Sequence, residues 1–295
     1  MKIVVLGSNG QLGSELKKSL EIYKPIFFTS KDLNITNFSS LEKMIDQEKP
    51  EILINAAAYT AVDKAESNII DAFKVNDQAV NIIAKRIKIL NSYLIHYSTD
   101  YVFDGKKKGK YNEDDETNPL SIYGKSKLAG ENKIVQSGCN YFIFRTSWVC
   151  GESGKNFIKT IKNLSLSKKT INVVNDQLGV PTSTKLISKV TKYLISDICK
   201  NNLWNTGIYN LVPNGKTNWY EMATLISKIA INEFSNVNFK NLLIKKISSE
   251  DYITEAIRPT NSLLSNKKLQ SKLNFTLSHW EEDFIPLVRK IFEEA

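Results

Sequence analysis

The stretch IVVLGSNGQLGSELKKSL, Ile3 to Leu20, decides the fold. Its first four residues, Ile3 to Leu6, are apolar and mostly β-branched, which is typical of a short buried strand. A glycine-rich turn, GSNGQLG, follows, and then Leu12, Leu16 and Leu20 recur at helical spacing. The stretch therefore predicts a strand, a glycine turn and a helix in that order.

The same alternation continues through the first half of the chain. Stretches with helical periodicity separate four further apolar runs: PIFFT, EILINAAA, SYLIHYST and NYFIFRTSW. Strands that alternate with helices predict right-handed crossovers and a parallel sheet that is covered on both faces. The fold class we expect is α/β, a doubly wound parallel sheet.

Composition and charge leave several classes of protein open and exclude others. The chain has 295 residues, a net charge of +9 and only one dense basic cluster, Gly105 to Lys110, which we interpret as a solvated loop. We find no recognition motif and no basic residues interleaved with stacking aromatics, so we expect no nucleic-acid partner. The opening MKIVVLG is too short for a signal peptide, and no apolar run reaches the ~18 residues of a membrane helix. We expect a cytoplasmic protein without a membrane partner.

The cysteines support a reducing compartment. Cys139, Cys150 and Cys199 are odd in number and form no C-x-x-C pair, which argues against a disulfide framework or a zinc site. We expect all three to be small core residues.

The glycine turn predicts a phosphate site. Gly7, Gly10 and Gly13 stand between the first strand and its helix, where a tight turn and a free helix N-terminus suit a pyrophosphate. A purely structural turn is the alternative. As cofactor-binding residues of this loop we predict the three glycines together with Asn9, Gln11 and Leu12.

The end of the second strand bears on the choice of nicotinamide cofactor. An acidic residue there would hold the ribose hydroxyls of NAD, and a basic residue would accept the phosphate of NADP. The sequence has Ser30 and Lys31 at this point, which favours NADPH, while the nearby Asp32 keeps NADH open.

Domain boundaries follow from where the alternation loosens, after about Gly151. We predict a Rossmann-type NAD(P)-binding domain over residues 1–155, to which 173–203 return. Residues 156–172 and 204–295 would form a smaller C-terminal α/β substrate-binding lobe.

A tyrosine and a lysine four residues apart predict a proton donor. Tyr123 and Lys127, in SIYGKSKLAGE, lie on one face of a predicted helix. A nearby ammonium lowers a tyrosine pKa from its usual ~10. Thr99 ends a predicted strand, and strand carboxyl ends form the ligand crevice of open α/β sheets. The three side chains should therefore meet near the glycine loop.

Blocks of sequence resemble a known family. The glycine loop, STDYVFDG and the Tyr123 and Lys127 pair resemble the extended short-chain dehydrogenase/reductase superfamily. More narrowly, the chain resembles the dTDP-4-dehydrorhamnose reductases in five blocks that span nearly its whole length: NAAAYTAVDKAE, STDYVFDG, RTSWVCG, DQLGVPT and RPTNS.

The resemblance implies a reaction. NADPH would reduce the C4 ketone of dTDP-4-dehydro-β-L-rhamnose to give dTDP-β-L-rhamnose, a precursor of surface polysaccharide. Tyr123 would protonate the developing alkoxide, Thr99 would hydrogen-bond the sugar oxygen, and Lys127 would hold the nicotinamide ribose and lower the Tyr123 pKa.

The resemblance also implies further site residues. On the cofactor side these are Asn34, which would accept from adenine, and the small or aromatic residues Ala57, Ala58 and Tyr59. For the substrate they are Thr60, Val62, Tyr101, Trp148, Asn156, Gln177 and Arg258.

Some positions depart from the family pattern. Cys150 replaces an aromatic residue, and Asn34 replaces a common aspartate. Some members dimerise through magnesium held by acidic side chains, but PTSTKLIS offers Lys185 and no acid, although Glu15 is available. We therefore predict no metal and a monomer or weak homodimer. His96 and His279 are isolated in the sequence, and we interpret both as structural.

Two other functions remain open. One is a non-catalytic regulatory module, because the regulatory beta subunit of methionine adenosyltransferase resembles these reductases and binds NADP. The other is an enzyme acting on another nucleotide sugar, such as a different 4-keto-sugar reductase, an epimerase or a dehydratase. Retention of Thr99, Tyr123 and Lys127 favours an enzyme. A dehydratase would commonly read T-D-E where this chain has Tyr101, which favours simple reduction.

Overall fold

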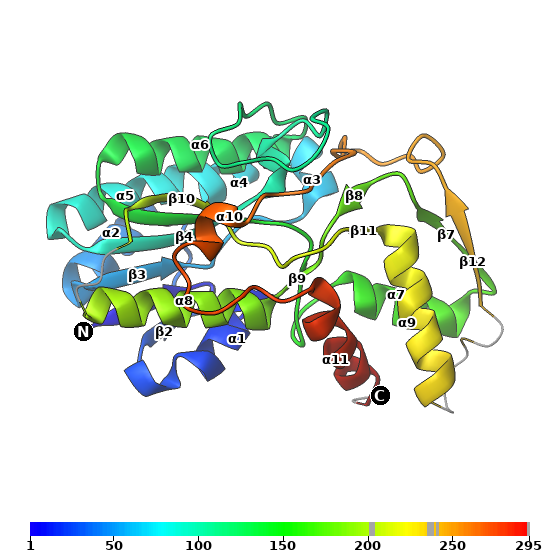
Figure 1. Ribbon diagram of the computed structural model, residues 1–295. Coiled ribbons are helices and arrows are strands. Elements are labelled where there is room, and N and C mark those ends of the chain that lie inside the picture. Colours follow the sequence, from blue (N-terminus) through cyan, green and yellow to red (C-terminus); the bar gives the residue numbers. More distant parts are fainter. Residues whose placement is uncertain (201–203, 235–238, 240–241, 294–295) are drawn as a thin grey trace.

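A six-stranded parallel sheet forms the centre of the computed structural model, which describes residues 1–200, 204–234, 239 and 242–293. Every neighbouring pair of strands runs parallel, in the order β10-β5-β4-β3-β1-β2 (Figure 1). The strands are β1 (Ile3–Leu6), β2 (Ile26–Phe28), β3 (Ile52–Asn55), β4 (Tyr93–Thr99), β5 (Asn140–Thr146) and β10 (Gly207–Asn210). The predicted doubly wound α/β fold is confirmed.

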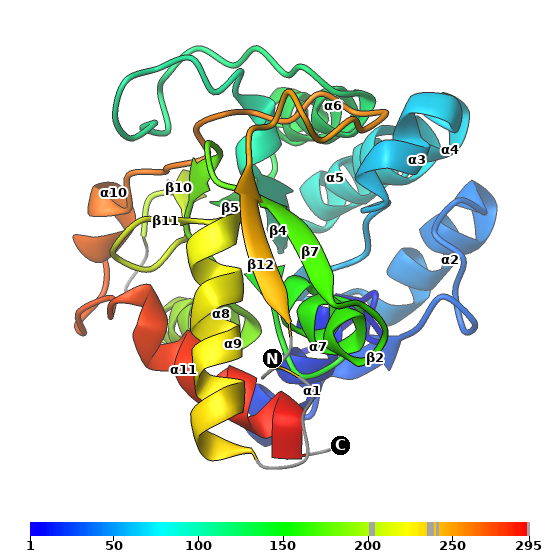
Figure 2. The same cartoon turned by 90° about the vertical axis from the view of Figure 1, so that its right-hand side faces the viewer.

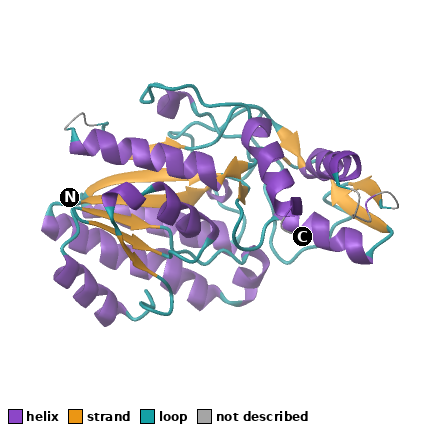
Figure 3. Ribbon diagram, turned by 90° about the horizontal axis from the view of Figure 1, so that it is seen from below, coloured by secondary structure: helices purple, strands orange, loops and turns teal. Residues whose placement is uncertain are grey.

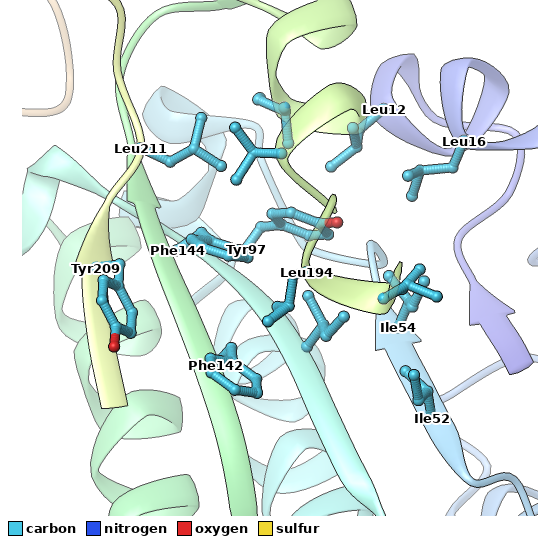
Figure 4. Close-up of a cluster of buried hydrophobic side chains, with 14 of the residues drawn as sticks. Leu12, Leu16, Ile52, Ile54, Tyr97, Phe142, Phe144, Leu194, Tyr209 and Leu211 are labelled. Atoms are coloured by element: carbon cyan, nitrogen blue, oxygen red, sulfur yellow. The ribbon is translucent and has the colours of Figure 1, made fainter. Parts of the chain in front are cut away.

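Side chains alternate across this sheet and bury it on both faces. In β1, Ile3 and Val5 join one buried apolar cluster, while Val4 and Leu6 join another. The first face is covered by α1 (Gln11–Ser19) and α8 (Thr184–Cys199), and the second by α2 (Phe38–Glu48), α5 (Ala79–Leu90) and α6 (Ile122–Ser137) (Figure 3). Figure 4 shows part of the first cluster, with leucines of α1 and α8 packed against aromatic residues of β4 and β5.

Short helices connect β3 to α5 and β4 to α6. They are α3 (Val62–Ser67), α4 (Ile69–Phe73), the π-helical segment η2 (Lys74–Gln78) and the 3-10 turn η3 (Asp100–Val102); another 3-10 turn, η1 (Glu21–Tyr23), precedes β2. The turn η3 starts directly after Thr99, at the carboxyl end of β4.

A smaller α/β lobe lies beyond the carboxyl ends of the main strands (Figure 2). In it, β7 (Thr170–Val174) pairs in parallel with β12 (Leu243–Ile247). Its helices α7 (Phe157–Ser167), α9 (Trp219–Glu233) and α11 (Trp280–Glu293) share a third buried apolar cluster. Two pairs of short strands, β6 (Val149–Cys150) with β9 (Thr182–Ser183) and β8 (Leu178–Gly179) with β11 (Thr217–Asn218), lie in the segments that lead into it.

The chain enters and leaves this lobe differently from our prediction. Residues 207–210 were assigned to the substrate lobe, but they form β10 and pair with β5 at the edge of the main sheet. The short helix α10 (Lys267–Gln270) also packs its Leu269 into the cluster of that sheet. Residues 173–174 belong to β7 rather than to the returning segment, and 201–203, at the end of that segment, lie outside the described residues. The assignment of the two parts of the chain to NAD(P) binding and to substrate binding stays a prediction.

One cysteine also differs from expectation. Cys139 and Cys150 are buried, as predicted, but Cys199 is exposed because it is the last residue of α8, at the rim of the sheet. No helix in the described part of the chain is long and apolar enough to cross a membrane.

The strand order determines where a ligand can bind. After β1 the chain adds β2 on one side, and β3 then pairs with the other side of β1. At such a switch point the flanking connections diverge and leave a crevice at the carboxyl ends of the strands. The glycine loop follows β1 and borders this crevice.

Candidate active site

Two glycines of the glycine loop are closely packed against other backbone, and the third borders empty space. Gly7 has φ +76°, and a Cβ there would lie 2.5 Å from the backbone nitrogen of Ala57. A Cβ at Gly13 would lie 2.2 Å from the Gly7 oxygen. At Gly10, the N-cap of α1, the nearest atom to a Cβ is 3.4 Å away, so the protein itself tolerates a side chain there. Gly10 borders two clefts, so the empty space beside it is available to a ligand at the helix N-terminus.

The first cleft, of about 290 Å³, lies between the ends of β1, β2 and β3. It is lined by Leu6, Gly7, Asn9, Gly10, Phe28, Ser30, Leu33, Asn34, Ile35, Ala56, Ala57, Ala58 and Val75. No carboxylate is among these lining residues. The shape and the glycine loop fit the adenosine half of a dinucleotide.

Asp32 is not among the residues that line this cleft. Its carboxylate accepts hydrogen bonds from the backbone nitrogen (2.8 Å) and the hydroxyl (2.7 Å) of Thr29, and these bonds hold its pKa below the usual value. Lys31 is exposed beside the cleft, while Ser30 is in its wall. Asp32, which left NADH as an alternative cofactor in the sequence, therefore uses its carboxylate in a hydrogen-bonded turn with Thr29.

Asn34 reaches the same cleft with its oxygen already in use. That oxygen accepts hydrogen bonds from the backbone nitrogen (3.0 Å) and the hydroxyl (2.8 Å) of Thr36. The predicted role of Asn34 as an acceptor for adenine thus competes with a local turn.

A second cleft, of about 590 Å³, brings the three predicted catalytic residues together. Thr99, Tyr123 and Lys127 all line it, along with Gly10, Gln11 and Leu12 of the glycine loop. The predicted substrate residues Thr60, Val62, Tyr101 and Trp148 line it as well. A ligand in this cleft can therefore touch the loop and the proposed proton donor at once.

Helix α6 holds Tyr123 and Lys127 in place from both ends. At its start, the Ser121 hydroxyl accepts from the Gly124 backbone nitrogen (3.1 Å) and the Glu66 carboxylate accepts from that of Ile122 (2.8 Å). Further along, Glu131 forms a buried ion pair with Arg145 of β5, with Nη2 and Oε2 2.7 Å apart. The pair therefore links α6 to β5, and removing one partner would leave an uncompensated buried charge.

Lys127 is buried and directed toward the sheet. Its Nζ donates to the Tyr97 carbonyl oxygen (2.6 Å) and lies 3.3 Å from Nε2 of His96, whose Nδ1 lies 3.2 Å from the Asn55 amide. Burial lowers the Lys127 pKa to about 8. His96, interpreted as an isolated structural histidine, is instead in direct contact with a predicted catalytic residue.

The Tyr123 pKa differs from our prediction. Burial raises it to about 12, a hydrogen bond with Thr99 lowers it, and the charge of Asp100 raises it. We expected Lys127 to lower this pKa, and for this structure that expectation is wrong. The main reason is that burial disfavours the charged phenolate, while the Lys127 ammonium donates to the Tyr97 carbonyl oxygen.

A third cleft, of about 570 Å³, extends the site into the smaller lobe. Gln177 and Arg258 line it, together with apolar residues of α7 and β7. Trp219 lines both this cleft and the second one, so its indole is their shared wall. The two cavities are therefore neighbours, as a long ligand such as a nucleotide sugar requires.

The Trp219 indole at this shared wall is stacked on the indole of Trp148, which lines the second cleft. The rings of Trp148 and Trp219 are 3.9 Å apart and 22° from parallel, and Trp219 Nε1 donates to Gln177 Oε1 at 3.1 Å. Trp148 has a left-handed backbone, with φ +46°, which is strained for a bulky residue. Such strain persists only where the surroundings hold the residue in place, and it is concentrated at functional sites.

Arg258 ties the smaller lobe to helix α3. Its Nη2 lies 2.7 Å from Oδ2 of Asp63, and this contact holds the Asp63 pKa below its usual range. Arg258, which we predicted to bind the diphosphate, is thus already paired with a carboxylate.

Four predicted residues lie outside the linings of these three clefts: Gly13, Lys31, Tyr59 and Asn156. Gly13 supports the loop from behind. The Tyr59 backbone nitrogen donates to Asn76 Oδ1 (2.9 Å). Asn156 caps α7 and donates to the Gly151 oxygen (2.7 Å) and to Gln11 Oε1 (3.3 Å), so it supports the loop beside the site.

Other lining residues were missed. In the second cleft they are Asn55, Ala56, Tyr97, Ser98, Asp100, Thr146, Val149, Gly154, Lys155, Ile187 and Trp219. Asp100 stands inside the STDYVFDG block, so the resemblance could have indicated it. Trp219 carries no local signal, because it reaches the site only through the packing of α9.

Prediction of a metal-free protein is not tested by these contacts. Within the described residues, no group of three or more His, Cys, Asp or Glu side chains could hold a metal ion. Lys185 lies 3.8 Å from Asp283, and Glu152 is paired with Lys18 and Lys290.

Comparison with known proteins places the site in a family context. The sequence model described as "RmlD substrate binding domain" matches residues 1–292. A dTDP-4-dehydrorhamnose reductase from Burkholderia thailandensis is 35% identical over 95% of both chains. The crystal structure of a dTDP-4-dehydrorhamnose reductase from Clostridium acetobutylicum has a TM-score of 0.87 and 33% identity over 99% of both chains. That from Bacillus anthracis, in complex with NADP, has a TM-score of 0.86 and 31% identity over 98% of this chain and 99% of the other.

Proposed function

This chain belongs to the dTDP-4-dehydrorhamnose reductase family, and on that premise we propose that it reduces the C4 ketone of dTDP-4-dehydro-β-L-rhamnose to dTDP-β-L-rhamnose with NADPH. The observation that carries this proposal is the meeting of Thr99, Tyr123 and Lys127 in one cleft with the glycine loop. A binding module without catalysis has no need of all three.

The residues around the first cleft fit NADPH. Gly10 leaves space at the N-terminus of α1, and Ala57 and Ala58 present small side chains on the facing strand end. Ser30 and Lys31 stand where an acid would favour NADH, and Asp32 is held in its own turn. Bound NADPH would supply the hydride. The complex of the Bacillus anthracis relative with NADP supports this choice over NADH.

Tyr123 supplies the proton. Its phenol keeps its hydrogen at neutral pH, because burial raises its pKa to about 12. A neutral phenol can give a proton to an alkoxide as negative charge develops on the C4 oxygen. Thr99 supplies a second donor to the same oxygen, and Lys127 would hold the nicotinamide ribose.

The second and third clefts suit the two ends of the substrate. Thr60, Val62, Tyr101 and Trp148 surround the sugar side of the second cleft. Gln177 and Arg258 line the third cleft, where a guanidinium suits the diphosphate. The Trp219 wall would lie along the link between sugar and nucleotide.

The test is NADPH oxidation, followed by absorbance, with freshly generated dTDP-4-dehydro-β-L-rhamnose. We expect turnover by the wild type and a fall in kcat of about 10²- to 10⁴-fold in Tyr123→Phe, as for loss of a general acid. Binding of NADPH should be unchanged in this variant.

Two outcomes would favour the alternatives. Turnover of a different nucleotide 4-keto-sugar, with none of the rhamnose precursor, would assign another substrate. NADPH binding without turnover of any such sugar would indicate a regulatory subunit.

We also infer a cytoplasmic location and a monomer or weak homodimer. The free cysteines Cys139, Cys150 and Cys199 support a reducing compartment. Light scattering of the purified chain, with and without magnesium, tests the oligomeric state.

A further inference from the structure

Thr99 and the next residue, Asp100, form a buried hydrogen-bonded pair beside the reacting centre. The Thr99 hydroxyl donates to Oδ1 of Asp100 at 3.1 Å and accepts from the Tyr101 backbone nitrogen at 3.2 Å. Thr99 is 5% exposed and Asp100 is 3% exposed, and both line the second cleft. The pair therefore belongs to the site although it faces away from bulk water.

A hydroxyl has only one proton to donate. In this structure the Thr99 proton points at Asp100, yet the Tyr123 phenol also lies within hydrogen-bonding reach of Thr99. The proposed role of Thr99 requires the same proton for the substrate oxygen. Asp100 and the substrate therefore compete for this hydrogen, whereas the Tyr123 phenol carries a hydrogen of its own.

The surroundings of the Asp100 carboxyl disfavour its ionised form. Its Oδ2 is buried without a hydrogen-bond partner among the described residues. Burial raises its pKa to about 6, while the nearby Ser262 and the Thr99 hydroxyl oppose the rise.

Among the described residues, no cationic side chain lowers the Asp100 pKa. The titratable groups that face the carboxyl are the phenols of Tyr101 and Tyr123, whose own pKa values are raised by burial and by Asp100. Arg258 and Asp63 act on Tyr101 and are paired with each other. The protonation of Asp100 can therefore change near neutral pH.

We propose that Asp100 is a positioning residue that decides whether the Thr99 proton is directed at the substrate. When Asp100 is ionised, it holds that proton. When Asp100 takes up a proton from solvent on Oδ1, it becomes the donor to Thr99 Oγ1, and the Thr99 hydroxyl is released to donate to the C4 oxygen. This inference rests on the proposed function.

The direction of the pH effect follows. The active form has Asp100 protonated, so kcat/KM should fall as the pH rises through the Asp100 pKa. A substrate that takes the Thr99 proton favours protonated Asp100, so substrate binding should take up protons from solvent near neutral pH.

The first test is the pH profile of kcat/KM for NADPH oxidation in the wild type, in Asp100→Asn and in Thr99→Ser. We expect the wild type to lose activity on ionisation of Asp100 by about tenfold or more, as for loss of one donor to an oxyanion. The neutral amide of Asp100→Asn should abolish this fall in kcat/KM with rising pH. Thr99→Ser, which keeps the hydroxyl, should retain the fall. If kcat/KM of Asp100→Asn falls with rising pH as it does in the wild type, the proposal is overturned.

The second test needs no turnover. Carboxyl NMR of enzyme labelled at aspartate, with Asp100→Asn for assignment, should show Asp100 titrating near 6, well above the usual ~4. In Thr99→Val the loss of the donor should raise that value further. An ordinary value, or one unmoved by Thr99→Val, contradicts the proposal. If the wild type instead fails to oxidise NADPH with this substrate, the proposed reaction falls and the role of Asp100 toward the substrate falls with it, while the titration still tests the hydrogen bond between Asp100 and Thr99.

Discussion

The cofactor end and the substrate end of this site are built from different materials. At the proposed cofactor end, the wall beside the N-terminus of α1 consists of backbone and small residues such as Gly10, Ala57 and Ala58, at the ends of two adjacent parallel strands. At the substrate end, the walls are the large side chains of Trp148, Trp219 and Arg258, which come from three distant segments.

The difference teaches how the two affinities can be separated. A backbone site is damaged by adding atoms, because it depends on space. A side-chain site is damaged by removing atoms, because it depends on contact area. Substitutions at the two ends should therefore change the binding of different ligands.

The largest effect is expected from filling the space at Gly10. Gly10→Val should weaken NADPH binding by about 3 kcal/mol, or on the order of a hundredfold, because the side chain occupies the position of the pyrophosphate. Calorimetric titration with NADPH measures this, and Gly10→Ala should fall between valine and wild type.

Gly13→Val is the contrast for this variant. A Cβ at Gly13 would meet the Gly7 oxygen at 2.2 Å, whereas at Gly10 the nearest atom is 3.4 Å away. Thermal melting should therefore be lowered in Gly13→Val and nearly unchanged in Gly10→Val. Equal destabilisation of both would show that Gly10 serves the fold rather than the ligand.

A smaller effect is expected from emptying the indole wall. Trp219→Leu removes the ring stacked on Trp148 and the bond to Gln177. Such aromatic pairs contribute about 0.5–1.5 kcal/mol beyond their buried area, so KM for the nucleotide sugar should rise by about tenfold. NADPH affinity should be unchanged, the reverse of the Gly10 result.

Trp219→Phe separates the two contacts at that wall. The phenyl ring keeps part of the stack and loses the N–H donor to Gln177. An intermediate KM would indicate that stacking dominates, and a parallel loss of NADPH affinity in either variant would contradict the separation of the two ends.

The smallest effect is expected at Lys31, which is exposed beside the cofactor cleft. Lys31→Gln should reduce the preference for NADPH over NADH by about threefold, since exposed charge contacts are weak. Lys24→Gln is a matched control, because it removes the same charge at the opposite end of β2. Ratios of kcat/KM for the two cofactors decide the matter, and an equal change in both variants would assign the effect to net charge.

The local features of the fold could be predicted because their causes are adjacent in the chain. The glycine triplet, the strands of the first half and the helix that carries Tyr123 and Lys127 each depend on residues that are close together in the sequence. Hydrophobic periodicity and turn chemistry report such local causes directly.

Other features depended on partners far away in the sequence. The segment that forms β10 has the same short apolar pattern as a lobe strand, and only its pairing with β5 assigns it to the main sheet. Trp219 becomes a wall of the site because α9 packs beside Trp148. The Lys127 ammonium is engaged by a carbonyl of β4, which no spacing within α6 could indicate.

The sequence by itself determined the doubly wound α/β fold, the glycine turn after the first strand and the helix that carries Tyr123 and Lys127, because each is encoded by short-range spacing and backbone chemistry. The tertiary structure alone decided which strand closes the sheet, which large side chains meet across the substrate cleft, and how burial and hydrogen bonding change the pKa values of Tyr123, Lys127 and Asp100. The physical reason is that desolvation and long-range contact arise only when the chain is folded.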